Sequence, residues 1–224
     1  MITVHHLNNS RSQRILWMLE EIGAEYEVKH YQRDNETQLA PQELFKVHPL
    51  GKSPVITDDA PKTHITVAES GAIIEYLAYA YGKAMIPRKN TEAYRQYIYW
   101  LHFSEGSLMP QMLLKLIFEK IKTSPMPFFI RPIAKGIANK VLGGYVLPNV
   151  KHNIEFIEKH LSENQWFAGK NMTGADIQMS FPLEATIAST NMDDYPNIKA
   201  YVKKIHSLDT YKKALEIGGP YDYA

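Results

Sequence analysis

The sequence predicts an α+β unit followed by an all-helical unit. Strand patterns occur in the first third of the chain and fade after Gly82, where apolar residues recur at helical spacing instead. The first third runs in the order strand, helix, strand, helix, strand, strand, helix. We therefore expect a βαβαββα unit in residues 1–82, a linker in residues 83–91, and an all-helical domain in residues 92–224.

The chain opens with a strand, a helix and a second strand. Residues 2–7 are strand-like and end at Asn8-Asn9, which is a turn signal. Ser10 is a good N-cap for a helix with apolar residues at helical spacing over 15–22, and Gly23 predicts its end. Residues 26–31 form the second predicted strand.

The rest of this unit is predicted as a short helix, two strands and a closing helix. The short helix runs from Pro41 to Val47, because the residue before Pro49 avoids helical geometry. Residues 55–57 and 65–67 are two short strands, joined by a hairpin-type turn in residues 58–62. Ser70 then caps a helix that continues to residue 81.

Four helical segments are predicted after the linker. The first spans about residues 92–122, with a kink at Pro110. The second spans about residues 133–161, with a break at Gly143-Gly144 or at Pro148. A capping box of Thr173 and Asp176 opens the third, and the last spans about residues 196–207.

Composition excludes several classes of function. The 224 residues include no cysteine, so disulfides, cysteine-bound zinc and a cysteine nucleophile are excluded. The 25 basic and 24 acidic residues give a formal charge of +1, which argues against a nucleic-acid partner. Apolar runs of membrane-spanning length are absent and a strand begins at residue 2, so we expect no membrane partner, no signal peptide and a cytoplasmic location. The histidines lack metal-ligand spacing, so we expect no metal.

Three short segments at element junctions carry the candidate chemistry. They offer a hydroxyl and an arginine at a helix start, a backbone stretch fixed by proline, and an acid–hydroxyl pair at a second helix start. These groups suit a small zwitterionic peptide that bears a thiol. A free thiol has a pKa of ~8.5, and lowering it by about two units requires ~2.7 kcal/mol. A hydroxyl donated to the sulfur can supply about 1.5–3 kcal/mol of this. The segments are Asn8–Arg11, Leu50–Val55 and Ala68–Gly71.

The order and spacing of these segments, with Gly169 and the capping box behind them, resemble the glutathione transferase family over almost the whole chain. Ser10-Arg11 is similar to the serine-type members, in the theta-like and the fungal or bacterial branches. Tyrosine-type members place a tyrosine near the end of the first strand, where this chain has His5-His6-Leu7. The resemblance implies a thioredoxin-like N-terminal domain, a helical domain that contributes the acceptor pocket, and a homodimer.

The resemblance also implies roles for individual residues. Ser10 would stabilise the glutathione thiolate as the catalytic residue, with Arg11 beside it and Asn9 and Ser12 as fallback donors. Pro54 would be cis and would turn the backbone of Val55 toward the cysteinyl part of glutathione. Taken singly, the same residues are ordinary helix caps and surface charges. The other implied glutathione ligands are Lys52 for the glycyl carboxylate, Ser53, Glu69 for the ammonium group and Ser70 for the γ-glutamyl carboxylate.

An apolar pocket for the acceptor is expected where the first long helix of the second domain faces Ser10. The residues expected there are Phe103, Ser107, Gln111 and Leu114. The predicted function is conjugation of the glutathione thiolate to small apolar electrophiles, as in detoxification, with glutathione as co-substrate and no cofactor. Two alternatives stay open: a non-catalytic ligand-binding or protein-interaction module, and a glutathione-dependent peroxidase, isomerase or dehalogenase.

Overall fold

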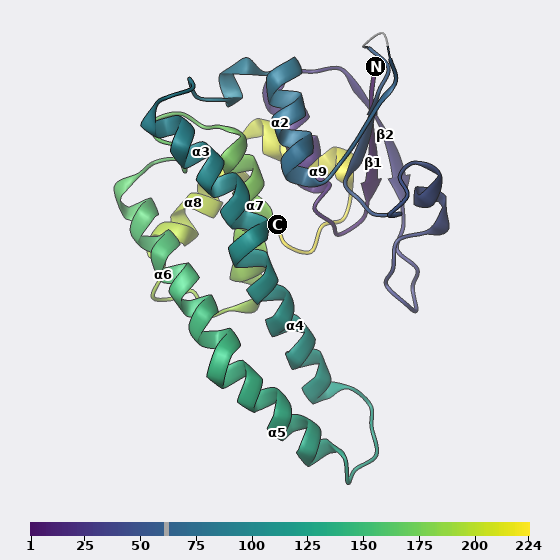
Figure 1. Ribbon diagram of the computed structural model, residues 1–224, viewed down its shortest axis with the longest axis vertical. Helices are drawn as coiled ribbons and strands as arrows, with labels where there is room; N and C mark the ends of the chain where they lie inside the picture. Colours follow the sequence, from purple (N-terminus) through teal and green to yellow (C-terminus); the bar gives the residue numbers. More distant parts are fainter. Residues whose placement is uncertain (61–62) are drawn as a thin grey trace.

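A four-stranded sheet forms the N-terminal end of the computed structural model, which describes residues 1–60 and 63–224. The strand order is β2-β1-β3-β4. β1 pairs with β2 in parallel, and β3 pairs with both β1 and β4 in antiparallel register. Figure 1 shows the sheet at one end of the molecule, beside α2 and α9. The strands are β1 (Ile2–Leu7), β2 (Tyr26–Tyr31), β3 (Val55–Asp58) and β4 (Ile65–Ala68).

The helices of this unit complete the βαβαββα order that the sequence predicts. α1 spans Gln13–Ile22, a 3₁₀ helix spans Gln42–Lys46, and α2 spans Ser70–Ala80. Gly23 has φ 64° and ends α1 in left-handed geometry, which glycine adopts without steric cost. Two residues of the expected hairpin-type turn, Pro61 and Lys62, lie outside the described residues.

Both predicted N-caps of this unit are wrong by one or two residues. The N-cap of α1 is Ser12, because the chain first makes a turn through Asn9, which has φ 47°. The N-cap of α2 is Glu69, with φ 70°, and Ser70 is the first helical residue. The hydroxyls of Ser10 and Ser70 are therefore not used as caps, and both bond to other side chains.

The second part of the chain is helical, after a short 3₁₀ helix at Lys83–Met85. Residues 1–60 and 63–224 include no helix that combines the length and the apolar character needed to cross a bilayer. The helices of this part are α3 (Glu92–Phe103), α4 (Met109–Thr123), α5 (Arg131–Val141), α6 (Leu147–Glu163), α7 (Gly174–Ser189), α8 (Pro196–Ser207) and α9 (Asp209–Gly218).

Each of the two long helical segments is interrupted by a π-helical turn just before a proline. Ser104–Leu108 joins α3 to α4, and Pro110 lies in the first turn of α4. Leu142–Val146 joins α5 to α6, and Pro148 lies in the first turn of α6. A proline offers no amide hydrogen to the preceding turn, so the backbone widens there instead of breaking. Both interruptions lie near the predicted positions, but the second is a π-helical turn and not the predicted break.

α9 is absent from the sequence prediction, which ends the last helix at residue 207. It follows α8 after the single residue Leu208, without a glycine or proline to mark the start of a new helix. α9 packs on α1. The rings of Trp17 and Tyr211 lie 5.4 Å apart, and the Gln13 side chain donates to the Ala214 carbonyl at 2.8 Å. α9 therefore covers the N-terminal unit rather than extending the helical one.

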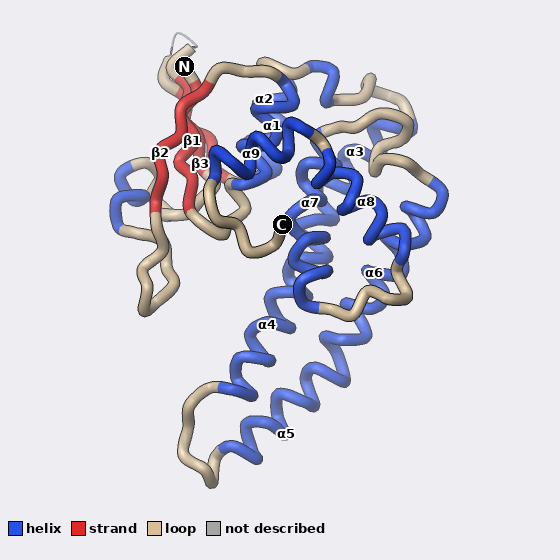
Figure 2. The backbone as a smooth tube through the Cα atoms, turned by 180° about the vertical axis from the view of Figure 1, so that it is seen from behind, coloured by secondary structure: helices blue, strands red, loops and turns tan. Residues whose placement is uncertain are grey.

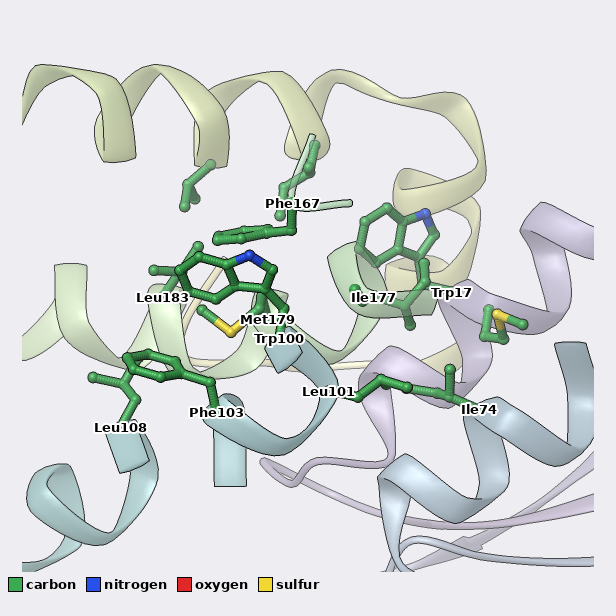
Figure 3. Close-up of a cluster of buried hydrophobic side chains, with 14 of the residues drawn as sticks. Trp17, Ile74, Trp100, Leu101, Phe103, Leu108, Phe167, Ile177, Met179 and Leu183 are labelled. Carbon is green, nitrogen blue, oxygen red and sulfur yellow. The ribbon is translucent and has the colours of Figure 1, made fainter. Parts of the chain in front are cut away.

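The core is continuous across both parts of the chain and is centred on α7. Its capping box forms as predicted, with Thr173 and Asp176 exchanging hydrogen bonds. The buried Asp176 carboxylate also accepts from the Phe167 amide at 2.9 Å and the Tyr201 hydroxyl at 2.8 Å. Figure 3 shows apolar side chains of α7 between residues from α1, α2 and α3. This packing fixes where α3 lies relative to the N-terminal unit.

Candidate active site

A cavity of about 220 Å³ is lined by residues from all three of the segments Asn8–Arg11, Leu50–Val55 and Ala68–Gly71. Because each segment lies at a junction of the α+β unit, the fold brings the three together. Six expected site residues line the cavity, namely Arg11, Lys52, Ser53, Pro54, Glu69 and Ser70. The rest of its wall is formed by His48, Leu50, Ala68 and Glu105.

The charges around this cavity are mixed. Arg11 and Lys52 are cationic, whereas Glu69 and Glu105 are anionic. A ligand with carboxylates and an ammonium group finds a partner of opposite charge for each kind. Sequence reasoning missed Glu105, which comes from the π-helical turn of the second part of the chain.

Glu105 is held by two arginines of the N-terminal unit. Arg11 Nε lies 3.1 Å from both carboxylate oxygens, and Arg14 also donates to this carboxylate. Partial burial alone would raise the pKa of the Glu105 carboxyl, but Arg14 and Arg11 outweigh it and lower that pKa. Glu105 therefore stays ionised and links the π-helical turn after α3 to the loop that carries Arg11.

Arg14 is the buried centre of this network. Its side chain is 1 % exposed and donates to the Gln178 carbonyl at 2.6 Å and to the Ser70 hydroxyl at 2.5 Å. The signal in the sequence is an arginine within the apolar stretch of α1, because a buried charge requires partners. Arg14 and Gln178, which both bond to Ser70, are further residues of this network that sequence reasoning missed.

The hydroxyl hydrogen of Ser70 is free to bond to a ligand. Both of its side-chain contacts are with donors, Arg14 and the Gln178 amide at 3.4 Å. Its own hydrogen is therefore not used by either neighbour. Since Ser70 lines the cavity, this hydrogen is available to an anionic group of a ligand.

The Ser10 hydroxyl, in contrast, is bonded inside the protein. It is 5 % exposed, it is not among the residues that line the cavity, and its hydroxyl oxygen lies 2.7 Å from that of Ser12. The Ser12 oxygen lies 2.9 Å from His6 Nδ1 and accepts from the Leu7 amide at 3.2 Å. His6 Nε2 faces the Gly218 carbonyl at 3.1 Å.

The Gly218 carbonyl sets the direction of this chain of hydrogen bonds. A carbonyl only accepts, so Nε2 of His6 carries the hydrogen and Nδ1 of the neutral ring accepts from Ser12. Ser12 then accepts from Ser10, whose hydrogen points into the protein. Burial, with a smaller contribution from the charge of His30, lowers the pKa of His6 to about 4, although the bond to Gly218 acts in the opposite direction. His6 is thus neutral near pH 7.

Of the remaining expected glutathione ligands, Ser53 lines the cavity, whereas Asn9 and Val55 do not. The Asn9 amide donates to the Asp222 carboxylate at 2.8 Å. The Ser53 hydroxyl donates to the His5 carbonyl at 2.9 Å, and the Ser53–Pro54 peptide bond is cis. Val55 is fully buried and lies in register between His5 and Ala68 in the sheet.

The residues expected to form the acceptor pocket lie elsewhere. Phe103 is 7 % exposed and packs among Trp100, Tyr99 and Phe156 in the core, as Figure 3 shows for Trp100. The placement of Phe103 in a pocket wall is therefore corrected. Neither the first cavity nor the one described next contains Ser107, Gln111 or Leu114 in its wall.

A second cavity of about 510 Å³ adjoins the first and shares Glu69, Ser70 and Glu105 with it. Leu101 of α3 and Glu105 of the following π-helical turn are about one helical turn apart, and both line this cavity. Phe103 lies on another side of the same helix. The described residues contain no cluster of three or more histidine or acidic side chains that could hold a metal ion. The further residues from the second part of the chain in this wall are His102, Gly106 and Gln178.

Comparison with known families matches both parts of the chain. Residues 1–79 match the family described as Glutathione S-transferase, N-terminal domain. Residues 127–209 match the family described as Glutathione S-transferase, C-terminal domain.

Individual relatives match over nearly the full length. The chain is 37 % identical to Glutathione S-transferase 3 of Schizosaccharomyces pombe, over 96 % of this chain and 87 % of the relative. It is 35 % identical to Glutathione S-transferase 1 of Saccharomyces cerevisiae, over 96 % and 94 %. The crystal structure of a glutathione S-transferase from Actinobacillus pleuropneumoniae superposes with a TM-score of 0.78 at 34 % identity, covering 100 % of this chain and 95 % of the other.

Proposed function

Because the chain belongs to the glutathione transferase family, we propose that it joins the thiolate of glutathione to small apolar electrophiles. The observation that carries this proposal is the cavity of about 220 Å³, which gathers cations, anions and a free hydroxyl from three separate segments. Glutathione has two carboxylates and one ammonium group, and each has a candidate partner there. No metal or redox cofactor is needed for this reaction.

The binding mode follows from the charges. Glu69 pairs with the ammonium group, and Ser70 donates its unused hydrogen to the neighbouring γ-glutamyl carboxylate at the start of α2. Lys52 pairs with the glycyl carboxylate, beside Ser53. Val55 lies between two strands and does not line the cavity, so pairing with the cysteinyl part of the peptide is assigned instead to the backbone of Ser53, which does line it. Asn9 supports the loop that carries Ser10 through its bonds to Asp222.

Stabilisation of the thiolate is assigned to Ser10 and Arg11. For Ser10 to donate to the sulfur, its hydrogen has to turn away from Ser12. The new bond is to a charged acceptor and is worth about 1.5–3 kcal/mol, against about 0.5–1.5 kcal/mol for the neutral bond that it replaces. Arg11 lines the cavity and adds positive potential near the sulfur. The assignment corresponds to the serine-type branch of the family.

The acceptor site is assigned to the cavity of about 510 Å³ between α2 and α3. It adjoins the glutathione site at Glu105, so an electrophile bound there lies next to the thiolate. Bringing the two reactants together supplies much of the rate gain. We further propose that residues 1–82 and 92–224 are two domains joined by a linker, and that the enzyme acts as a cytoplasmic homodimer in detoxification.

The test compares Ser10→Ala with the unchanged enzyme. We expect Ser10→Ala to lower kcat/KM for a chlorodinitrobenzene-type substrate about a hundredfold, since the thiolate loses a charge-assisted hydrogen bond. Binding of glutathione should persist, while the ultraviolet absorbance of the bound thiolate should disappear. Ser107→Ala, at an exposed residue outside both cavities, is the matched control and should change neither value.

The outcomes separate the candidate functions. Full turnover of Ser10→Ala would reject Ser10 as the thiolate-stabilising residue. Tight binding of glutathione without thiolate absorbance in the unchanged protein would instead favour a non-catalytic ligand-binding module.

A further inference from the structure

A proline lies in the interior of α7, the helix at the centre of the core. Pro182 is buried, and α7 continues past it to Ser189. Figures 1 and 2 show from opposite sides that α7 lies among other helices, and it contacts α1, α2 and α3. The nitrogen of a proline carries no hydrogen, so the carbonyl four residues earlier loses its helical partner. In α7 that carbonyl belongs to Gln178.

Two side chains bond to the Gln178 carbonyl in place of the missing amide. Arg14 Nη1 donates to it at 2.6 Å, and the Ser104 hydroxyl donates to it at 3.0 Å. Arg14, Ser104 and Gln178 are all buried, where a carbonyl without a partner is costly. A carbonyl oxygen has two lone pairs, and here both are open to donors from outside the helix. Pro182 thus provides an acceptor in the middle of a buried helix.

Arg14 extends from this acceptor to the cavity of about 220 Å³. Its second terminal nitrogen, Nη2, donates to the Ser70 hydroxyl and to the Glu105 carboxylate. Both of these residues line the cavity. Because the guanidinium group is planar and rigid, an acceptor that fixes Nη1 also sets the direction of Nη2. The Gln178 carbonyl therefore orients the donor that bonds to Ser70.

The same carbonyl also holds the element that carries Glu105. Ser104 is the first residue of the π-helical turn, and Glu105 follows it directly. Arg14 comes from α1, whereas Ser104 comes from the second part of the chain. One backbone oxygen therefore anchors both partners of the Arg14–Glu105 ion pair.

We propose that Pro182 is a positioning residue for glutathione binding, because it frees the Gln178 carbonyl that orients Arg14 against Ser70. The inference rests on the proposed function, in which Ser70 donates to the γ-glutamyl carboxylate. Ser70 keeps its hydrogen for the ligand because its oxygen accepts from Arg14 and from the Gln178 side chain. Pro182 itself lies in the wall of neither cavity, so it acts only through these residues.

Alanine at position 182 would restore an ordinary helix. Its amide hydrogen would bond to the Gln178 carbonyl, as in any uninterrupted α-helix. That bond competes with Arg14 and Ser104 for the same oxygen. Arg14 then loses its anchor, and the Ser70 oxygen loses a firmly placed donor. Alanine is the best helix former, so the Pro182→Ala variant should fold.

Titration calorimetry of the full chain with glutathione tests the proposal. We expect Pro182→Ala to bind glutathione about fivefold more weakly, which corresponds to the loss of one hydrogen bond of ordinary strength. The KM for glutathione should rise by the same factor. In contrast, kcat should stay within about twofold, because Ser10 and Arg11 act on the sulfur at saturation.

Pro196→Ala is the matched control. Pro196 is the first residue of α8, where a missing amide hydrogen costs no helical bond. It lies in the wall of neither cavity. The same chemical change at this position should alter neither the affinity for glutathione nor kcat.

A double-mutant cycle with Ser70→Ala shows whether the effect of Pro182 passes through Ser70. Ser70→Ala alone should weaken glutathione binding about tenfold, since the carboxylate loses a charge-assisted hydrogen bond. The hydroxyl that Arg14 orients is then absent. Adding Pro182→Ala to Ser70→Ala should therefore weaken binding by less than about twofold further.

Three results would overturn the proposal. They are unchanged glutathione affinity in Pro182→Ala, an equal loss of affinity in Pro196→Ala, and a loss from Pro182→Ala that is as large with Ser70→Ala as without it. Failure of the proposed function looks different, because the unchanged protein would then bind no glutathione, and the role of Pro182 would be rejected together with that function.

Discussion

The hydroxyl oxygens of Ser10 and Ser12 lie 2.7 Å apart, and Ser12 in turn contacts His6. The residue assigned to stabilise the thiolate thus begins with its hydrogen directed into the protein, whereas Ser70 begins with its hydrogen free. Binding of the sulfur has to compete with an internal partner. The neighbours of Ser10 therefore help to set how strongly it acts on the thiol.

Ser12→Ala should lose more stability than Ser10→Ala, whereas Ser10→Ala should lose more of the bound thiolate. Ser12→Ala leaves both the Leu7 amide and His6 Nδ1 without a partner, whereas Ser10→Ala leaves only the Ser12 amide. We expect Ser12→Ala to be less stable than Ser10→Ala by about 1–3 kcal/mol, the cost of one more unsatisfied buried group. Ser12→Ala should nevertheless keep the thiolate absorbance that Ser10→Ala loses. Urea unfolding measures the loss of stability, and difference spectra of the glutathione complex measure the loss of thiolate. If the same variant showed the larger loss in both measurements, this view would be contradicted.

His6 should make stability depend on pH in mildly acidic solution. Its pKa in the folded protein is about 4, below the ordinary value of 6.5. The unfolded chain therefore binds more protons than the folded one between these values, and stability falls as pH drops from about 6.5 to 4. The shift corresponds to about 3 kcal/mol in total. His6→Gln should show a flatter profile of unfolding free energy against pH, whereas His152→Gln, at an exposed residue on α6, should follow the unchanged protein. A profile for His6→Gln as steep as that of the unchanged protein would refute the assignment.

Removing the charge of Glu105 should loosen the contact between the two parts of the chain. Glu105→Gln leaves the buried guanidinium of Arg14 without its carboxylate. We expect a loss of about 1–3 kcal/mol at pH 7. Because the pKa of Glu105 is lowered in the folded protein, its contribution is present above the ordinary value of 4.5 and is lost as pH falls further. The difference in unfolding free energy between the two proteins should therefore shrink in acid. Glu27→Gln, on the outside of β2, is the control that should show no such difference.

The contact between α7 and α2 should not tolerate a side chain at Gly174. A Cβ atom there would lie 2.6 Å from Cγ2 of Ile74. We expect Gly174→Ala to cost about 1–3 kcal/mol through overpacking, and Ile74→Ala to cost about 2–5 kcal/mol through the space it leaves. In the double variant the added methyl group enters that space, so the combined loss should be smaller than the sum by about 0.5–3 kcal/mol. Strict additivity in chemical unfolding would show that the two positions do not meet.

The sequence predicts most of the fold because local signals decide its elements. Gly23 ends α1, the two prolines mark both π-helical turns, and Thr173 with Asp176 opens α7. The prediction fails where tertiary contacts decide instead. α9 follows α8 after one residue without a breaker, and it is held in place by its contact with α1. The start of α1 is displaced because Ser10 bonds to Ser12 and not to the helix.

The sequence predicts the part of the candidate site that comes from the α+β unit, but not the part that comes from the helices. The three junction segments meet because each lies at a turn of the α+β unit, and eight of their residues line one cavity. The contribution of the helical part is set by the phase of α3 relative to that cavity. Sequence spacing alone does not fix this phase, so the sequence predicts Phe103 in the pocket, whereas Glu105 and His102 occupy its wall.

The loop that carries Ser10 and Arg11 is held by residues more than two hundred positions further along the chain. Asn9 bonds to Asp222, 213 positions away, and His6 to Gly218, 212 positions away. During synthesis on the ribosome, the first strand and helix emerge long before these partners exist. The earliest residues to leave the exit tunnel should thus be among the last to reach their final arrangement, and a nascent chain that lacks α9 should bind no glutathione.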